Sequence, residues 1–349
     1  MAPQPRTPRQ WELDALRVFA IAGVVMIHVS GLLLAHDDLI GTARRQAAVA
    51  VNVGLTWVVP VFVMISGALT LSPRAHADGP VAFYRKRFAR ILPALLVWHV
   101  IYLVVVRLWM RGEPFHPRVV VVGLLDAKMF TALYFLWLIA GLYVIAPVIA
   151  AFLAGGGRRR AFGVAGVALL WTQLVYALST LSSLLGEPRP IHLGAWTQWW
   201  PYVGLFVAGW ALRDVVLRPV GLVIASVVGC AAVAEPIWQY GVHGPRALVL
   251  LPITRLGPMM AVAAISFFLV AIGLGARLTP GPGVAVVLRR LSDAAFGVFL
   301  VHLLILEVLK PAVPTRSLWA LAGAFVVTLA ASFMISLVAG RIRYLRMIF

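Results

Sequence analysis

The first apolar segment of the chain carries two ionisable side chains on one helical face. Arg17 opens the segment, and His28 follows 11 residues later. Eleven steps of about 100° return the chain to within about 20° of its starting direction, with a rise of about 16 Å. His28 would therefore lie near mid-membrane, where an imidazole can act as a base. Asp14 lies on the same stripe and can pair with Arg17, so we predict all three as catalytic residues. In the alternative interpretation, which stays open, Arg17 marks the membrane border and His28 bonds a neighbouring helix.

Two further histidines are expected at a similar depth. His99 follows Arg90 by nine residues, and His302 follows Asp293 by nine. Their helices run in the same direction as the first, so the three imidazoles can lie at one level and form a site. For His99 the favoured interpretation is a hydrogen-bonded core residue, whereas for His302 the two interpretations remain open.

A basic cluster occupies residues 83–90, which we expect to form a cytoplasmic loop ending near Pro93. Its cations are Arg85, Lys86, Arg87 and Arg90. Such a cluster can hold a polyanionic cofactor such as a nucleotide diphosphate. The alternative is a stop-transfer charge run that contacts anionic lipid.

The composition indicates a membrane protein. Of the 349 residues, 62% are hydrophobic and 12% are charged, which excludes a soluble globular domain and a disordered chain. The apolar runs are long and unbroken, which favours helices over the strands of a β-barrel. We predict an all-α polytopic bundle of about ten transmembrane helices, spanning 15–35, 46–71, 91–110, 130–153, 161–183, 196–212, 218–236, 258–276, 293–310 and 317–340.

The basic residues set the orientation. The net charge is +18, but the cations cluster between apolar runs, so we expect no nucleic-acid partner. With the N-terminus on one side, 19 of the 30 Lys and Arg residues fall on that side. Both termini are therefore predicted to be cytoplasmic. We expect a single membrane domain over 1–349, with a core at 10–340 and short basic tails.

Several known catalytic signatures are missing from the sequence. It has no G-x-S-x-G elbow, no H-E-x-x-H helix, no C-x-x-C pair and no P-loop. We therefore expect no metal site and no tightly bound cofactor. If the protein is an enzyme, a histidine within the membrane is the best available base.

Five segments in order resemble the acyltransferase-3 family of integral membrane acyltransferases. They are E-L-D-A-L-R at 12–17 followed by His28, V-P-V-F-V-M-I-S-G at 59–67, R-F-A-R at 87–90, L-Y-F-L-W at 133–137, and S-D-A-A-F-G-V-F-L-V-H at 292–302. The chain is most similar to the bacterial O-acetyltransferase subgroup that includes the enterobacterial common antigen enzyme. It departs from the family pattern at Tyr134, and in the order Phe-Leu-Trp that follows it.

The resemblance implies transfer of an acyl group, expected to be acetyl, from cytoplasmic acetyl-CoA to a hydroxyl of a cell-surface or lipid-linked carbohydrate. Residues Arg85, Lys86, Arg87 and Arg90 would hold the CoA phosphates, with Arg17 orienting the pantetheine arm or a phosphate. His28 would either take a proton from the acceptor hydroxyl or carry the acyl group.

The resemblance also places the acceptor side. His302 is expected to position the acceptor, with Ser66, Tyr134 and Trp137 as further substrate-binding residues. Ser66 and Gly67 would let two helices approach closely beside the site. The expected location is the plasma membrane.

Two other functions are alternatives to acyl transfer. A transporter or flippase for a lipid-linked saccharide would also use midplane histidines, although the sequence shows no inverted repeat. A scaffold in a glycan-assembly complex would not need buried ionisable groups. The oligomeric state and the identities of the acyl group and acceptor do not follow from the sequence.

Overall fold

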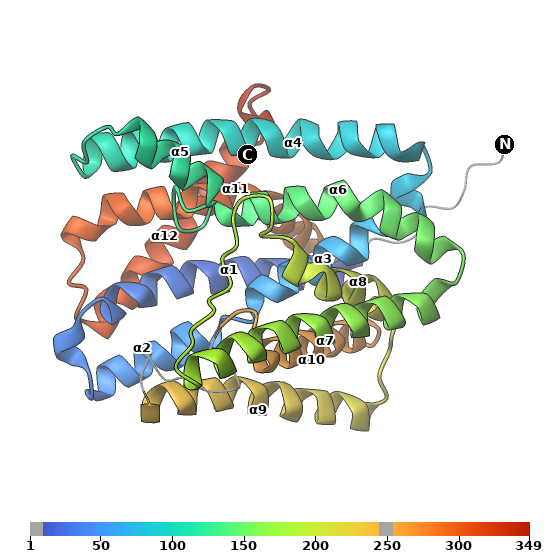
Figure 1. The fold of residues 1–349 in the computed structure, drawn as a ribbon. Coiled ribbons are helices and arrows are strands. Elements are labelled where there is room, and N and C mark those ends of the chain that lie inside the picture. The colour runs from blue at the N-terminus through green and yellow to red at the C-terminus, as the bar shows by residue number, and fades with distance from the viewer. Residues whose placement is uncertain (1–9, 244–253) are drawn as a thin grey trace.

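The protein is a bundle of long helices with roughly aligned axes (Figure 1). It is described here from a computed structural model, which covers residues 10–243 and 254–349. The α-helices are α1 (Trp11–Leu34), α2 (Ala43–Gly54), α3 (Val58–Thr70), α4 (Gly79–Ile101), α5 (Pro117–Leu125), α6 (Tyr134–Ala154), α7 (Gly157–Leu184), α8 (Val203–Leu212), α9 (Pro219–His243), α10 (Pro258–Gly275), α11 (Pro282–Leu309) and α12 (Leu318–Ala339).

Nine helical stretches in the described part of the chain are long and apolar enough to cross a membrane. They are Trp11–Leu34, Ala43–Thr70, Gly79–Met110, Tyr134–Ala154, Gly157–Leu184, Pro219–Gly241, Pro258–Gly275, Pro282–Ala312 and Leu318–Ala339. Each corresponds to one predicted span. The all-α, polytopic membrane class is therefore confirmed.

The bundle has two ends that the chain visits alternately. We call the end that holds the first residues of α1 and α4 the inner end, and the opposite end the outer end (Figure 1). The links after α3, α6, α8 and α10 lie at the inner end. The helix starts beside these links carry most of the inner cations, in α4, α7 and α11. Counted together, links and helix starts at the inner end hold more described Lys and Arg residues than the outer end does, so the positive-inside rule predicts that the inner end faces the cytoplasm.

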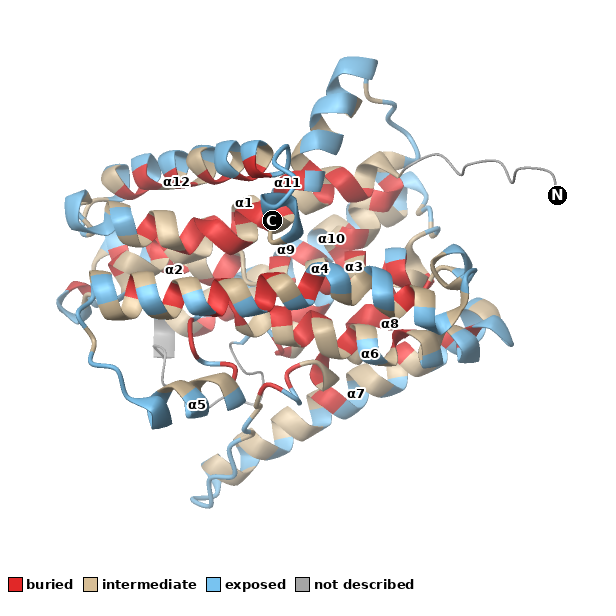
Figure 2. Ribbon diagram, turned by 90° about the horizontal axis from the view of Figure 1, so that it is seen from above, coloured by how far each residue is buried: buried red, intermediate tan, exposed pale blue. Residues whose placement is uncertain are grey.

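Burial is concentrated in the middle of the bundle (Figure 2). α1 and α11 pack against each other and carry many of the buried residues. Helices at the periphery of the bundle expose large apolar side chains, as α7 does with Val167, Leu170 and Trp171. Such a surface suits contact with lipid tails, which are as apolar as leucine.

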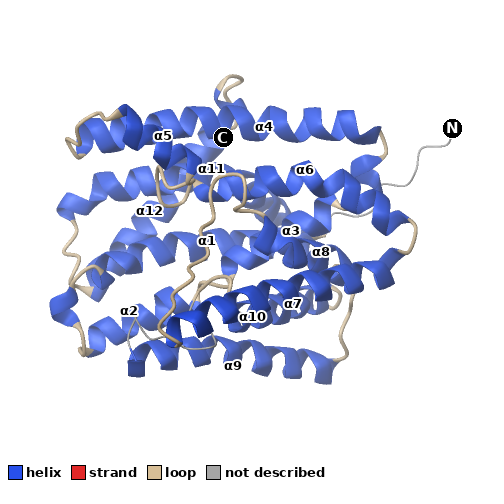
Figure 3. Ribbon diagram, viewed as in Figure 1, coloured by secondary structure: helices blue, strands red, loops and turns tan. Residues whose placement is uncertain are grey.

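The sixth predicted span, 196–212, is wrong in its length. Only Trp200–Leu212 is helical, and 13 residues rise about 20 Å, short of a hydrocarbon core of about 30 Å. The chain at 187–199 is not helical (Figure 3). Irregular backbone is tolerated at membrane depth where it lines a cavity, and Ile191, His192 and Leu193 line one here. This stretch and α8 together still take the chain from the outer to the inner end.

The basic segment 83–90 is also not the loop that was predicted. It forms the first turns of α4, with Pro93 inside the helix, and a π-helix at Tyr102–Met110 continues it. Lys and Arg are good helix formers, and α4 can extend beyond the hydrocarbon while its long side chains reach the interface. The helical geometry fixes which of these cations share a face.

Two glycines bring α3 and α8 into backbone contact. A Cβ added at Gly67 would lie 1.7 Å from the carbonyl oxygen of Phe206 on α8. A Cβ added at Gly209 would lie 1.9 Å from the carbonyl oxygen of Met64 on α3. The close approach expected at Gly67 is confirmed. It holds the short α8 firmly beside the helix that carries Ser66.

Candidate active site

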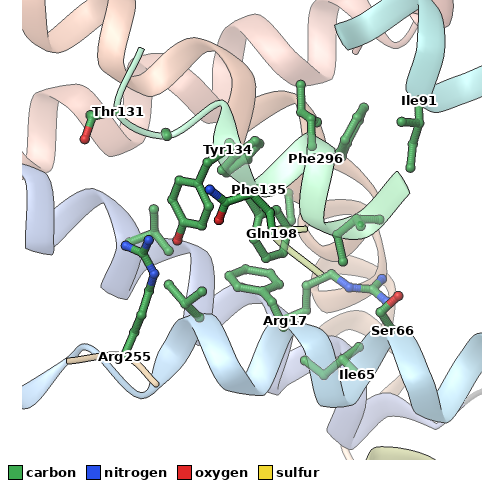
Figure 4. Close-up of a pocket in the computed structure, with 18 of the residues that line it drawn as sticks. Arg17, Ile65, Ser66, Ile91, Thr131, Tyr134, Phe135, Gln198, Arg255 and Phe296 are labelled. Atoms are coloured by element: carbon green, nitrogen blue, oxygen red, sulfur yellow. The ribbon is translucent and has the colours of Figure 1, made fainter. Parts of the chain in front are cut away.

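A cavity of about 890 Å³ runs through the bundle. Such a volume lies toward the upper end of the range for small-molecule sites. Its lining comes from α1, α2, α3, α4, α6, α7 and α11, from the α2–α3 link, and from the segments before α6, α8 and α10. Inner-end residues such as Arg90 and outer-end residues such as Arg255 both line it. Figure 4 shows part of the lining, including Arg17 and Arg255.

Arg17 and His28 both line this cavity, as their shared helical face predicts. In Figure 4 the guanidinium of Arg17 reaches toward Ser66, which also lines the cavity. The imidazole of His28 makes no hydrogen bond with other described residues, and it lines the cavity. A ring in that position is available to a substrate group.

Asp14 lies behind Arg17 and does not line the cavity. Its carboxylate oxygen Oδ1 accepts a hydrogen bond of 2.7 Å from the hydroxyl of Ser292, and Arg17 donates one of 3.0 Å to the same hydroxyl. The direct distance from Arg17 Nη1 to Asp14 Oδ1 is 4.0 Å. Asp14 is thus placed to hold Arg17 through Ser292, and direct contact with a substrate is not supported because it is buried.

His302 lies against His28 rather than in the cavity. Their ring centroids are 5.3 Å apart, and His302 is fully buried. The predicted contact of His302 with the acceptor is therefore not supported. Its Nδ1 is 3.1 Å from the carbonyl oxygen of Val298, which can only accept, so Nδ1 donates and Nε2 carries the lone pair. That Nε2 is buried without a hydrogen-bond partner.

His99 does not join the other two histidines. It is buried, donates from Nδ1 to the carbonyl oxygen of Leu95 at 2.7 Å, and accepts at Nε2 from the indole of Trp137 at 3.3 Å. The interpretation as a hydrogen-bonded core histidine is confirmed. α4 packs against α6, whereas α1 packs against α11, which explains the separation. Trp137 donates this bond and does not line the cavity, and its role in substrate binding stays a prediction.

The inner mouth of the cavity is basic. Lys86, Arg87 and Arg90 line it, with the guanidinium of Arg90 4.9 Å from the ring centre of Phe296. Arg85 is exposed and lies outside the lining, because five residues turn it about 140° around α4 from Arg90. Its predicted role in cofactor binding is therefore not supported by its position.

Two of the predicted substrate residues line the cavity. Ser66 donates a hydrogen bond of 3.4 Å to the hydroxyl of Tyr143, whose ring lies under Arg87 at 5.5 Å. Tyr134 lies at the outer end, with the guanidinium of Arg255 4.0 Å from its ring centre. Ser66 and Tyr134 thus mark the inner and outer parts of the same cavity.

Sequence reasoning missed two residues of this site. Ser292, the bridge between Arg17 and Asp14, was noted only as the start of a motif. Its signal was a Ser-Asp pair at the border of an apolar run, which is weak. Arg255 looked like any other loop cation, and nothing in its sequence context distinguishes it.

The lining is strongly electropositive. It carries six cations and one carboxylate, Asp293, within the described chain. Arg90 and Asp293 interact at the inner end. A cavity with this charge, an accessible imidazole and apolar walls fits an anionic substrate whose reacting group sits in a drier region.

Comparison with known families identifies the class of protein. The model of the acyltransferase domain family, acyltransferase-3, matches residues 10–337. The chain belongs to this family and is a membrane-embedded acyltransferase. No curated protein and no solved structure matches the chain. Family membership favours acyl transfer over the transporter and scaffold alternatives.

Proposed function

We propose that the protein is an O-acetyltransferase of the plasma membrane, within the bacterial O-acetyltransferase subgroup of its family. The acetyl group would come from cytoplasmic acetyl-CoA and go to a hydroxyl of a cell-surface or lipid-linked carbohydrate. The observation that carries the proposal is that one cavity is lined by inner-end cations, His28 and outer-end polar groups. A donor and an acceptor entering from opposite ends would meet near the imidazole.

The inner mouth supports the donor assignment. CoA carries a diphosphate and a further phosphate, and guanidinium groups form bidentate bonds with such oxyanions. Lys86, Arg87 and Arg90 would bind them, with the thioester reaching inward past Arg17. The Ser292 hydroxyl holds Arg17 in place for contact with the pantetheine arm or a phosphate.

Two chemical routes are open at His28. In the first, a ring nitrogen takes the proton of the acceptor hydroxyl as its oxygen attacks the thioester carbonyl. The carbon–sulfur bond then breaks, and the imidazolium returns its proton to the CoA thiolate. In the second, the imidazole itself attacks the thioester, CoA leaves, and the acceptor oxygen displaces the acyl-imidazole.

The test is acetyl transfer by purified protein in lipid nanodiscs, with labelled acetyl-CoA and isolated cell-surface glycans. His28→Ala is expected to lower the rate about 10²–10⁴-fold. His116→Ala is the matched control, because His116 is exposed at the outer end and lies outside the cavity. Equal product yields from wild type and His28→Ala would refute the assignment.

A second pair of variants tests the donor site on one helix. Arg90→Gln removes a cation from the cavity, whereas Arg85→Gln removes one that lies outside it. Loss of a charge-assisted bond to phosphate is expected to raise the KM for acetyl-CoA about tenfold to hundredfold in Arg90→Gln alone. Equal changes in both variants would indicate a general surface effect. Intact-protein mass after incubation with acetyl-CoA alone distinguishes the routes, since only the second leaves an acetylated enzyme.

A further inference from the structure

The outer end of the cavity holds a cation that the donor does not need. Arg255 lies just before α10 and lines the cavity, at the end opposite to Lys86, Arg87 and Arg90. Its guanidinium faces the ring of Tyr134 at 4.0 Å. Figure 4 shows the two side chains pointing toward one another from different segments. The hydroxyls of Tyr176 and Tyr202 interact electrostatically with the same cation.

Arg255 has no carboxylate partner within the described residues. The other lining cation at this end, Lys128, has Asp126 at 3.9 Å. The one carboxylate of the described lining, Asp293, lies at the inner end beside Arg90. The guanidinium lines the cavity with phenol rings around it and no carboxylate partner among the described residues, which suits it to an anionic ligand.

Other residues of the cavity provide hydrogen-bonding groups and an aromatic ring that suit a sugar. Gln198, Thr254 and His192 line the same cavity and offer hydrogen bonds to hydroxyl groups. Tyr134 adds an aromatic surface. Arg255 also lies close enough to His28 for an electrostatic interaction between them. An anion bound by Arg255 would thus stand near the imidazole, with adjoining hydroxyls in reach of it.

We propose that the outer end of the cavity is an oxyanion site, and that the acceptor is an anionic carbohydrate bound through a phosphate or a carboxylate by Arg255. This inference rests on the proposed acetyl transfer and specifies its acceptor. The phosphate could belong to a lipid-linked sugar diphosphate, and the carboxylate to an acidic sugar. Both share the planar or tetrahedral oxyanion that a guanidinium recognises.

The experiment compares wild type, Arg255→Gln and Arg255→Lys in acetyl transfer to three acceptors: a neutral oligosaccharide, its uronic-acid counterpart and its phosphorylated counterpart. Arg255→Gln is expected to raise the KM for a charged acceptor about tenfold to hundredfold. The KM for the neutral acceptor should rise much less, so the inference predicts a fall in the preference for charged over neutral acceptor. Arg255→Lys should recover part of the loss, because it keeps the charge and loses the bidentate geometry. Arg118→Gln, which removes an exposed outer-end cation outside the cavity, is the matched control.

Two results would overturn the inference. One is an unchanged KM for both charged acceptors in Arg255→Gln, and the other is an equal loss with neutral and charged acceptors. The uronic-acid and phosphorylated arms identify which oxyanion the site takes. Binding of glucuronate and of inorganic phosphate, measured by calorimetry on wild type and Arg255→Gln, gives a readout without turnover. If wild type transfers acetyl to none of the acceptors, the proposed function fails, and the calorimetric difference alone then decides the oxyanion site.

Discussion

Replacing Gly67 by alanine should separate α3 from α8. The added Cβ would lie 1.7 Å from the carbonyl oxygen of Phe206, whereas ordinary contact begins near 3.4 Å. The helices would have to move apart by about 1.7 Å. The obstacle is backbone on a packed helix, so no side chain can turn away to make room. Overpacking of this kind typically costs about 1–3 kcal/mol, and we expect the upper part of that range.

The assay is thermal unfolding of purified Gly67→Ala in detergent, followed by helical circular dichroism. A loss of about 3 kcal/mol should lower the midpoint by about 5 °C or more. Gly163→Ala is the matched control on lipid-facing α7, where nothing lies within 4 Å of the added Cβ. Alanine in a helix is favoured over glycine by about 1 kcal/mol, so this variant should be neutral or slightly stabilised. If both variants unfolded at the wild-type temperature, the close packing of α3 on α8 described here would be refuted.

Two more changes probe the support of the catalytic residues. Ser292→Ala removes the hydroxyl that joins Arg17 to Asp14. Loss of a hydrogen bond to a buried carboxylate should destabilise the protein by about 1–3 kcal/mol in chemical unfolding and raise the KM for acetyl-CoA. An unchanged KM would argue against a role of Ser292 in placing Arg17. His302→Phe removes the nitrogen lone pair beside His28 while keeping a ring, so kcat should fall about tenfold with little change in either KM. His302→Gln has an amide oxygen that can accept a hydrogen bond, so it should recover part of the lost kcat. Equal kcat values in wild type and His302→Phe would show that His302 only fills space.

The expected effect of His302→Phe follows from the position of His302 beside His28. The ring centres are 5.3 Å apart, and His302 Nε2 has no hydrogen-bond partner in this arrangement. A rotation of the His28 ring that brought one of its N–H groups to about 3 Å would let His302 Nε2 accept a hydrogen bond from it. The other nitrogen would carry its lone pair toward the cavity. A positioning residue of this kind acts on kcat through the orientation of the base.

Much of the architecture follows from the sequence, because it depends on periodicity and composition. Nine of the ten predicted spans correspond to long apolar helices of the described chain, since about 20 apolar residues can hardly be anything else in a bilayer. The sequence also predicts the shared face of Arg17 and His28, because helix geometry alone relates residues on one helix. The sixth span failed because an irregular segment can replace half a helix where it lines a cavity, and hydropathy does not register cavities.

The partners of each side chain were decided by tertiary packing. His99 and His302 have the same nine-residue spacing from a charged residue at the membrane border, so the sequence does not distinguish them. In the structure α11 packs on α1, which places His302 beside His28. α4 instead packs on α6, where His99 accepts a hydrogen bond from Trp137. Residue spacing within a helix carries no information about which helices touch. Arg255 joined the site for the same reason, since only the folded bundle places the segment before α10 beside the start of α6.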